Sequence, residues 1–349
     1  MTPDIAALLA IDGVANGAVY ALVAIGLVLI FTVTRVIFVP FGDIAALAAL
    51  TLAAYEDRRT PGTPALLATL ALLAAAAEII TLRCQPRKIL RTLLTTLALP
   101  LAIAAIGWAV GRWAAAGHDL PAPIRIALTL LLVLPVAPLL DRLVFRPVAD
   151  ASILLLMVLA VALHFALVGL LLLTFGPEGI RTAPMTEALL QLGDITIPGQ
   201  TALIVAATIL FSALLYAFGR TRTGRALQAV AVNRTGARIV GIRPGRAGTT
   251  AYLIGSLLAG LSGILIAPVN TVFYDTGFLL GLLAFVGAII GGLSSYPVTV
   301  LGALLVGLLG SFASFYSSAY KEVLVFALLI PVLLWRSVSA THSEEDIEE

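Results

Sequence analysis

The chain has 349 residues, of which 60% are hydrophobic and only 11% are charged, and its formal net charge is +2. Because a soluble domain carries about 25% charged residues, this composition excludes a cytosolic enzyme, a nucleic-acid-binding protein and a disordered protein. The apolar runs lack the alternation of membrane β-strands. The composition therefore predicts an all-α polytopic membrane protein, whose helices satisfy their own backbone polar groups inside lipid.

Apolar runs of about 20 residues, long enough to cross a bilayer as helices, recur along the whole chain. We expect about 9–11 transmembrane segments within residues 1–337, followed by an acidic tail at 338–349. The predicted segments are 8–32, 36–55, 64–82, 89–111, 121–141, 151–175, 200–218, 247–268, 278–294, 296–317 and 320–336. The run at 278–294 is short and rich in glycine, so a broken or re-entrant segment is the alternative to a full span there.

Scarce residue types limit the chemistry further. Cys84 is the only cysteine, so we expect neither a disulfide nor a cysteine metal cluster. Lysine occurs only at Lys88 and Lys321, and neither belongs to a phosphate-binding GxxxxGK[ST] loop. No metal and no cofactor are therefore expected in this chain. The start lacks the basic residues of a cleaved signal peptide, so the first apolar segment is expected to remain as an anchor.

The distribution of arginine predicts the orientation in the membrane. Residues 219–246 include seven arginines and no acidic residue. Moving them through the bilayer would cost roughly 20 kcal/mol, at about 3 kcal/mol each, so this segment is expected in the cytoplasm. Counting spans from there places the N-terminus and the loop 176–200 outside, and the C-terminus in the cytoplasm.

Polar side chains within the first two spans are candidates for function. Asp12, Asn16 and Tyr20 share one helical face, and Asn16 is the polar group that we expect on a solute pathway. Asp43 follows Gly42 near the start of the second span. It is either a helix-terminus charge near the cytoplasmic boundary or part of an inner gate.

Polar side chains in later spans receive different interpretations. Asn270 and Tyr274 are predicted at the outer end of the span 247–268, where an outer gate could lie. His164 has no second ligand nearby in the sequence, so a structural hydrogen bond is favoured over a metal site. Glu78 lies close to Arg83, and its carboxylate is expected to reach the inner boundary of the membrane.

The cytoplasmic segment has helical character over 226–240, interrupted at Asn233 and Gly236, and ends near Pro244. This pattern predicts two short helices joined by a turn. Such a helix flanked by arginines either docks into the cleft of a cytoplasmic partner or lies as an ordinary basic loop on the membrane.

This segment resembles the coupling region of type II ABC importer permeases, in particular the branched-chain amino-acid permease family, whose loop reads GRA.RA.A.N...A.L.GI. The residues expected to couple to an ATPase on this resemblance are Arg225, Ala226, Gln228, Ala229, Ala231, Asn233, Arg234, Ala237, Arg238, Ile239 and Gly241. Further similarity lies in Asn16-Gly17, Tyr20-Ala21-Leu22, Gly42-Asp43, Phe145-Arg146-Pro147, the glycine-rich stretch 287–307 and Tyr320-Lys321-Glu322. Two features depart from the family: residues 64–141 hold an extra helix pair, and Phe38-Val39-Pro40-Phe41 replaces a more polar sequence.

The resemblance implies a type II importer-like bundle in the inner (plasma) membrane of a bacterium. Its partners would be ATPase subunits that bind ATP and magnesium, a second permease subunit that is identical or homologous, membrane lipid and an external solute-binding protein. The expected cargo is a small polar or zwitterionic solute, most simply a branched-chain or other amino acid. A permease for sugars or urea-like amides and an ion-coupled secondary transporter remain alternatives.

Overall fold

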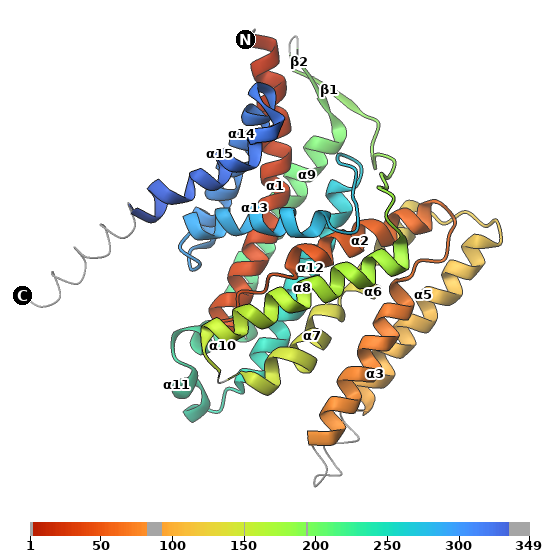
Figure 1. Cartoon of the computed structure of the whole chain (residues 1–349), viewed down its shortest axis with the longest axis vertical. Helices are drawn as coiled ribbons and strands as arrows, with labels where there is room; N and C mark the ends of the chain where they lie inside the picture. The colour runs from red at the N-terminus through yellow and green to blue at the C-terminus, as the bar shows by residue number, and fades with distance from the viewer. Residues whose placement is uncertain (1–2, 82–92, 150, 193–194, 335–349) are drawn as a thin grey trace, which may run out of the picture.

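The computed structural model describes residues 3–81, 93–149, 151–192 and 195–334, and it confirms an all-α membrane fold (Figure 1). Eight helices in this part of the chain are long and apolar enough to cross a membrane. They are α1 (Pro3–Thr34), α3 (Thr63–Thr81), α5 (Leu99–Ala115) with the π-helical turn Leu93–Ala98 before it, the Ala122–Val148 segment, α8 (Ile153–Phe175), α9 (Gly199–Gly219), α12 (Pro244–Ile266) and α14 (Tyr296–Tyr316). Cys84, Arg83, Lys88 and the tail 338–349 lie outside the described residues.

Two predicted segments form helices shorter than a membrane span. They are α2 (Phe41–Glu56, 16 residues) and α13 (Thr276–Ile290, 15 residues). The last predicted segment forms α15 (Lys321–Ala327) and, after a turn at Leu328, continues as helix to residue 334, where the described residues end. Almost every side chain of α2 is buried, so this helix is surrounded by protein rather than by lipid. A left-handed turn at Gly292 (φ 65°) and Leu293 (φ 54°) follows α13. This turn ends the helix, so the glycine-rich segment predicted at 278–294 stays short.

Helices α1 and α12 form the centre of the bundle, with α2, α13 and α14 packed around them. Small residues allow this packing, because they let the backbones approach closely where lipid offers no hydrophobic drive to associate. A Cβ atom at Gly307 would lie 2.3 Å from the Gly17 nitrogen, and one at Gly263 would lie 1.9 Å from the Ala45 oxygen. Gly307 and Gly263 therefore allow close helix packing within this chain.

The outer helices present apolar side chains to the surroundings. Phe165 and Leu173 on α8 and Ile209 on α9 are 67%, 85% and 65% exposed, as expected of lipid-facing positions. Helices α3 and α5, from the predicted extra pair, lie at the right-hand edge of the bundle (Figure 1). The Tyr55 hydroxyl donates to the Gly107 oxygen at 3.0 Å and so attaches α5 to α2.

One of the eight candidate membrane spans is not a continuous α-helix. The segment Ala122–Val148 contains α6 (Ala122–Val133), α7 (Val136–Leu140), a π-helical turn Asp141–Phe145 and a 3-10 turn Arg146–Val148. The break between α6 and α7 falls at Pro135, which lacks the backbone N–H that a continuous helix needs. This irregular end brings Asp141 and Arg146 towards the start of α12.

The loop predicted outside the membrane contains a β-hairpin that the sequence analysis did not anticipate. Strands β1 (Leu189–Leu192) and β2 (Ile195–Pro198) pair antiparallel, and Ile180 forms an isolated antiparallel bridge with Val272. In Figure 1 the hairpin lies at the upper end of the bundle, and the helices of residues 222–239 lie at the lower end. The hairpin and these helices therefore lie at opposite ends of the bundle.

Candidate functional site

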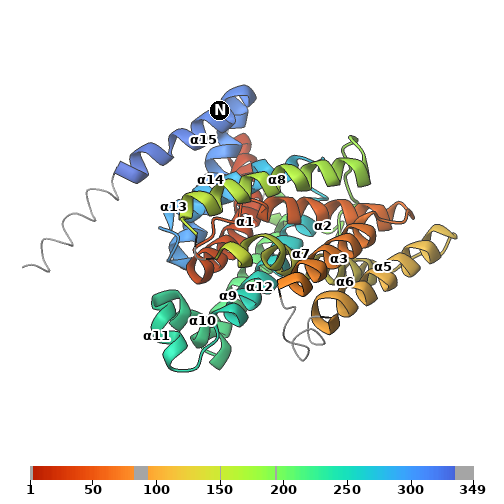
Figure 2. The same ribbon diagram turned by 60° about the horizontal axis from the view of Figure 1, so that its bottom comes forward.

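The arginine-rich segment forms two short helices, as the sequence predicted. They are α10 (Arg222–Val232) and α11 (Arg234–Ile239), and Figure 2 shows them together at one edge of the molecule, away from α3 and α5. Side chains cap both N-termini: Thr221 Oγ1 accepts from the Gly224 nitrogen at 3.1 Å, and Asn233 Oδ1 accepts from the Gly236 nitrogen at 2.8 Å. We call the unit 221–240 the helical elbow.

The apolar side of the helical elbow packs on the two central helices of the bundle. Leu227 and Val230 from α10 and Ala237 from α11 are each 3% exposed. They form one buried cluster with Leu29 and Val33 of α1 and with Ala247 and Ala251 of α12. The sequence analysis placed Ala237 among the coupling residues but did not select Leu227 or Val230. Their spacing of three residues on one helical face was the available signal.

A backbone contact strengthens this docking. The last turn of α1 leads into Arg35, whose φ of 62° is left-handed, and its backbone nitrogen donates to the Phe31 oxygen at 2.8 Å. The Arg35 guanidinium then donates to the Ala231 oxygen at 3.2 Å. A cation thus satisfies a carbonyl in the last turn of α10, where the helix dipole favours positive charge.

The opposite side of the helical elbow faces away from the bundle. Val232, Ile239 and Val240 are 86%, 82% and 73% exposed. All members of the predicted coupling set except Ala237 are exposed or half-buried. They are Arg225, Ala226, Gln228, Ala229, Ala231, Asn233, Arg234, Arg238, Ile239 and Gly241. This surface combines apolar side chains with arginines, as a docking surface for another protein does.

Two of the polar residues predicted on a solute pathway meet at the other end of the bundle. Asn270 Nδ2 donates to Asn16 Oδ1 at 3.2 Å, although the two residues are 254 positions apart. Asn270 and Tyr20 also line one cavity of about 310 Å³. Tyr274 is half-buried and does not line this cavity. The sequence analysis did not select Lys321, which lines it too.

The walls of this cavity are mixed in character. Tyr20, Asn270 and Lys321 provide polar groups, while Ile266 and Leu280 belong to its apolar part. Next to the lining residue Ile266, the Leu265 oxygen accepts a hydrogen bond from Nε2 of the buried Gln200 at 3.1 Å. This bond connects α9 to the end of α12. A cavity with an apolar wall and a few polar groups is the usual form of a small-molecule site.

Asp43 lies elsewhere in the bundle. His164 Nδ1 donates to Asp43 Oδ2 at 2.7 Å, and the carboxylate is 1% exposed. The structural hydrogen bond predicted for His164 is confirmed. Asp43 lies in the first turn of α2, and this turn is buried inside the bundle, where Asp43 pairs with a residue at the middle of the 23-residue α8.

Among the described residues, no group of three or more His, Cys, Asp or Glu side chains lies close enough together to hold a metal ion. The residues predicted on a pathway or in coupling lie in the helical elbow, around the Tyr20–Asn270 cavity and in the Asp43–His164 pair. The helical elbow and the cavity both contact α1 and α12.

Comparison with known proteins identifies the class more closely. The family model described as branched-chain amino acid transport system, permease component, matches residues 101–333. The chain belongs to this permease family. The matched part includes the helical elbow, α12, α13 and α14, and it begins within α5.

Curated relatives agree with this assignment. The high-affinity branched-chain amino acid transport system permease protein LivH of Escherichia coli K12 is 31% identical over 202 residues, which is 56% of this chain and 66% of LivH. LivH of Salmonella typhimurium LT2 gives the same identity and coverage. The corresponding permease protein BraD of Pseudomonas aeruginosa is 27% identical over 204 residues, again 56% of this chain and 66% of BraD. No solved structure matches the chain.

Proposed function

We propose that the chain is the membrane-spanning permease subunit of an ABC importer in a bacterial inner membrane. The observation that carries the proposal is that the helical elbow packs on α1 and α12, the same two helices that lead to the Tyr20–Asn270 cavity. Along α1, Val33 and Tyr20 are 13 residues apart, or about 20 Å at 1.5 Å per residue. A rigid helix of this length transmits a displacement of one end to the other.

In this proposal the energy comes from separate subunits. ATPase subunits bind ATP and magnesium and dock on the exposed face of the helical elbow, at Val232, Ile239 and the neighbouring arginines. Their closure moves α10 and α11, and the buried Leu227 and Val230 pass that motion to α1 and α12. A second permease subunit completes the membrane pathway, and an external solute-binding protein delivers the cargo at the β-hairpin end.

The proposed solute is a branched-chain or other small amino acid. The LivH and BraD relatives are named for branched-chain amino acid transport. The cavity of about 310 Å³ has apolar side chains that suit an aliphatic side chain, and Lys321 supplies a positive charge for a carboxylate. Sugars and urea-like amides would use the polar groups but leave the apolar wall without a partner.

Reconstitution tests this proposal. Proteoliposomes containing the chain, its second permease subunit, the ATPase subunits and the solute-binding protein should take up labelled leucine only when ATP is present. Replacing 229–239 with a Gly/Ser linker of equal length should abolish uptake while membrane insertion stays normal, because the linker cannot form α11 or the end of α10. Normal ATP-driven uptake by this variant would refute the coupling role.

One observation favours an ion-coupled secondary transporter as the second candidate. The Asp43–His164 pair is a buried, ionisable pair within the helix bundle, and secondary transporters place coupling charges near the middle of the membrane. Uptake by the chain alone, driven by a proton gradient and lost on Asp43→Asn, would establish this candidate in place of the importer.

A further inference from the structure

A basic cavity lies on the same side of the bundle as the helical elbow but outside the contacts that the proposed coupling uses. It has a volume of about 340 Å³ and lies between α3, the turn before α5, the irregular end of the Ala122–Val148 segment and the start of α12. Four arginines line it: Arg142, Arg146, Arg243 and Arg246. The acidic group in its lining is Glu78.

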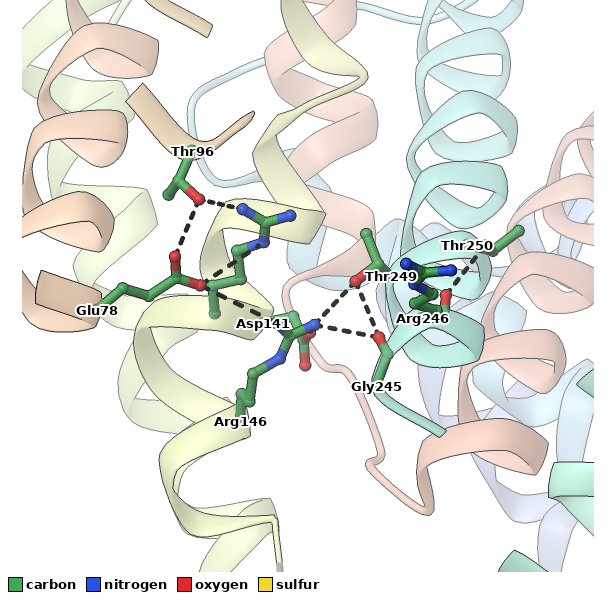
Figure 3. A network of polar contacts seen from close by, with 9 residues as sticks. Glu78, Thr96, Asp141, Arg146, Gly245, Arg246, Thr249 and Thr250 are labelled. Atoms are coloured by element: carbon green, nitrogen blue, oxygen red, sulfur yellow. Dashed lines mark hydrogen bonds and ion pairs between the residues drawn. The ribbon is translucent and has the colours of Figure 1, made fainter. Parts of the chain in front are cut away.

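Polar contacts hold two of these arginines in place (Figure 3). Arg146 Nη2 donates to Thr249 Oγ1 at 2.8 Å and to the Gly245 oxygen at 3.1 Å, and it pairs with Asp141 at 3.4 Å. Arg142 donates to the Thr96 hydroxyl, which in turn donates to Glu78 Oε2 at 3.0 Å. The network therefore joins four segments around the cavity before any ligand binds. Arg83, the partner that the sequence suggested for Glu78, lies outside the described residues.

The charges of the cavity do not balance. Arg142 and Arg146 share Glu78 at 3.9 and 4.0 Å, and Arg146 also uses Asp141. In the described part of the chain, the Arg243 and Arg246 side chains have no carboxylate within 4.0 Å. Counted over the described residues alone, the cavity thus keeps the charge of about two arginines in excess. It also lies at the N-terminus of the 23-residue α12, whose dipole adds further positive potential.

The position of the cavity indicates the source of the anion. Ile80 lies two residues after Glu78 and is 60% exposed, and Leu94 lies one residue before Thr95 of the cavity lining and is 58% exposed. These apolar side chains belong to membrane-spanning helices. A phosphate placed among the arginines would therefore have acyl chains beside Ile80 and Leu94. A free phosphate would use only the arginines.

We propose that this cavity binds the headgroup of an anionic phospholipid, such as phosphatidylglycerol, in the membrane leaflet next to the helical elbow. Arg243 and Arg246 contact the phosphate, Arg146 holds the start of α12 in position, and the acyl chains follow α3 and the turn before α5. Basic pockets between membrane helices on the cytoplasmic side bind such headgroups. The lipid would fix α12 at the end where α11 joins it, so lipid composition would affect this junction.

The test uses the full chain, purified in detergent and freed of lipid. Native mass spectrometry measures the binding of phosphatidylglycerol and of phosphatidylcholine with identical acyl chains, each alone and in competition with inorganic phosphate. We expect the chain to prefer phosphatidylglycerol. The double substitution Arg243→Gln/Arg246→Gln should reduce that preference by about thirtyfold, or roughly fivefold for each arginine. Both side chains are exposed, so the fold should tolerate the change.

Matched variants separate this site from general charge. Arg222→Gln/Arg225→Gln removes two exposed arginines from α10 and should leave the preference unchanged, and Arg243→Lys/Arg246→Lys should retain most of it. Equal binding of the two lipids by the unaltered chain would overturn the proposal. Equal loss in the α10 control would overturn it too, and displacement of the lipid by millimolar phosphate would assign the cavity to a soluble anion instead.

Discussion

The close contact between α14 and α1 gives a quantitative test of the fold. Gly307 of α14 faces α1 so closely that an added Cβ would lie 2.3 Å from the Gly17 nitrogen and 2.4 Å from the Gly13 oxygen. Real Cβ contacts are almost never shorter than 3.0 Å, so Gly307→Ala would force these backbones apart by at least 0.7 Å. Backbone atoms of a buried helix cannot rotate away as a flexible side chain can. We therefore predict that this substitution lowers the free energy of unfolding by about 1–3 kcal/mol, the usual cost of overpacking.

The chain offers a matched control for this substitution. Gly169 lies within the membrane-spanning α8, and a Cβ there would meet no atom within 4 Å. Gly169→Ala should leave stability unchanged or raise it by up to about 1 kcal/mol, because alanine favours the helix. Thermal unfolding of both variants in the same detergent should show a lower midpoint only for Gly307→Ala. Equal midpoints would refute the close packing of α1 on α14.

Three further predictions concern the other polar and apolar contacts. Leu227→Ala should weaken the docking of α10 by about 2–5 kcal/mol, which would be measured as faster amide hydrogen exchange in α10 and as reduced ATP-driven uptake. The control Val232→Ala, at an exposed position, should leave the hydrogen exchange unchanged. His164→Phe should destabilise the chain by about 3–5 kcal/mol because it leaves the Asp43 carboxylate buried without its partner. The midpoint of thermal unfolding should rise again in the double variant with Asp43→Asn, and an unchanged midpoint would refute the Asp43–His164 pairing. Asn270→Leu should raise the solute concentration for half-maximal uptake about tenfold, the effect of one lost hydrogen bond, and an unchanged value would remove Asn270 from the cavity that binds solute.

The sequence predicted the helical elbow well because its signals are local. An N-terminal helix cap needs only a Thr or Asn whose side-chain oxygen accepts a hydrogen bond from the backbone nitrogen three residues later. Thr221 and Asn233 both satisfy this rule. The break between α10 and α11 at Asn233 follows from the same local chemistry. The helix pattern also placed Leu227 and Val230 on one face, but the sequence did not indicate which helices they would meet.

The pathway residues show where local signals end. Asn16 and Asn270 were both singled out, yet their direct hydrogen bond spans 254 positions and depends on how α1 packs beside α12. Asp43 was expected either as a helix-terminus charge near the cytoplasmic boundary or as part of an inner gate. In the structure α2 begins within the bundle, and the buried Asp43 carboxylate accepts a hydrogen bond from His164 there. Burial of a helix terminus by other helices is a tertiary property, so a hydropathy pattern does not report it.

By itself, the sequence determined that the chain is a helical membrane protein, because lipid allows few other ways to satisfy backbone polar groups, and it located the arginine-rich elbow, because charge is costly to move across a bilayer. Only the tertiary structure decided which glycines touch a neighbouring backbone and which arginines surround the cavity at the start of α12. These features depend on contacts between segments far apart in the chain. Hydropathy and spacing describe each segment alone, whereas packing places them together.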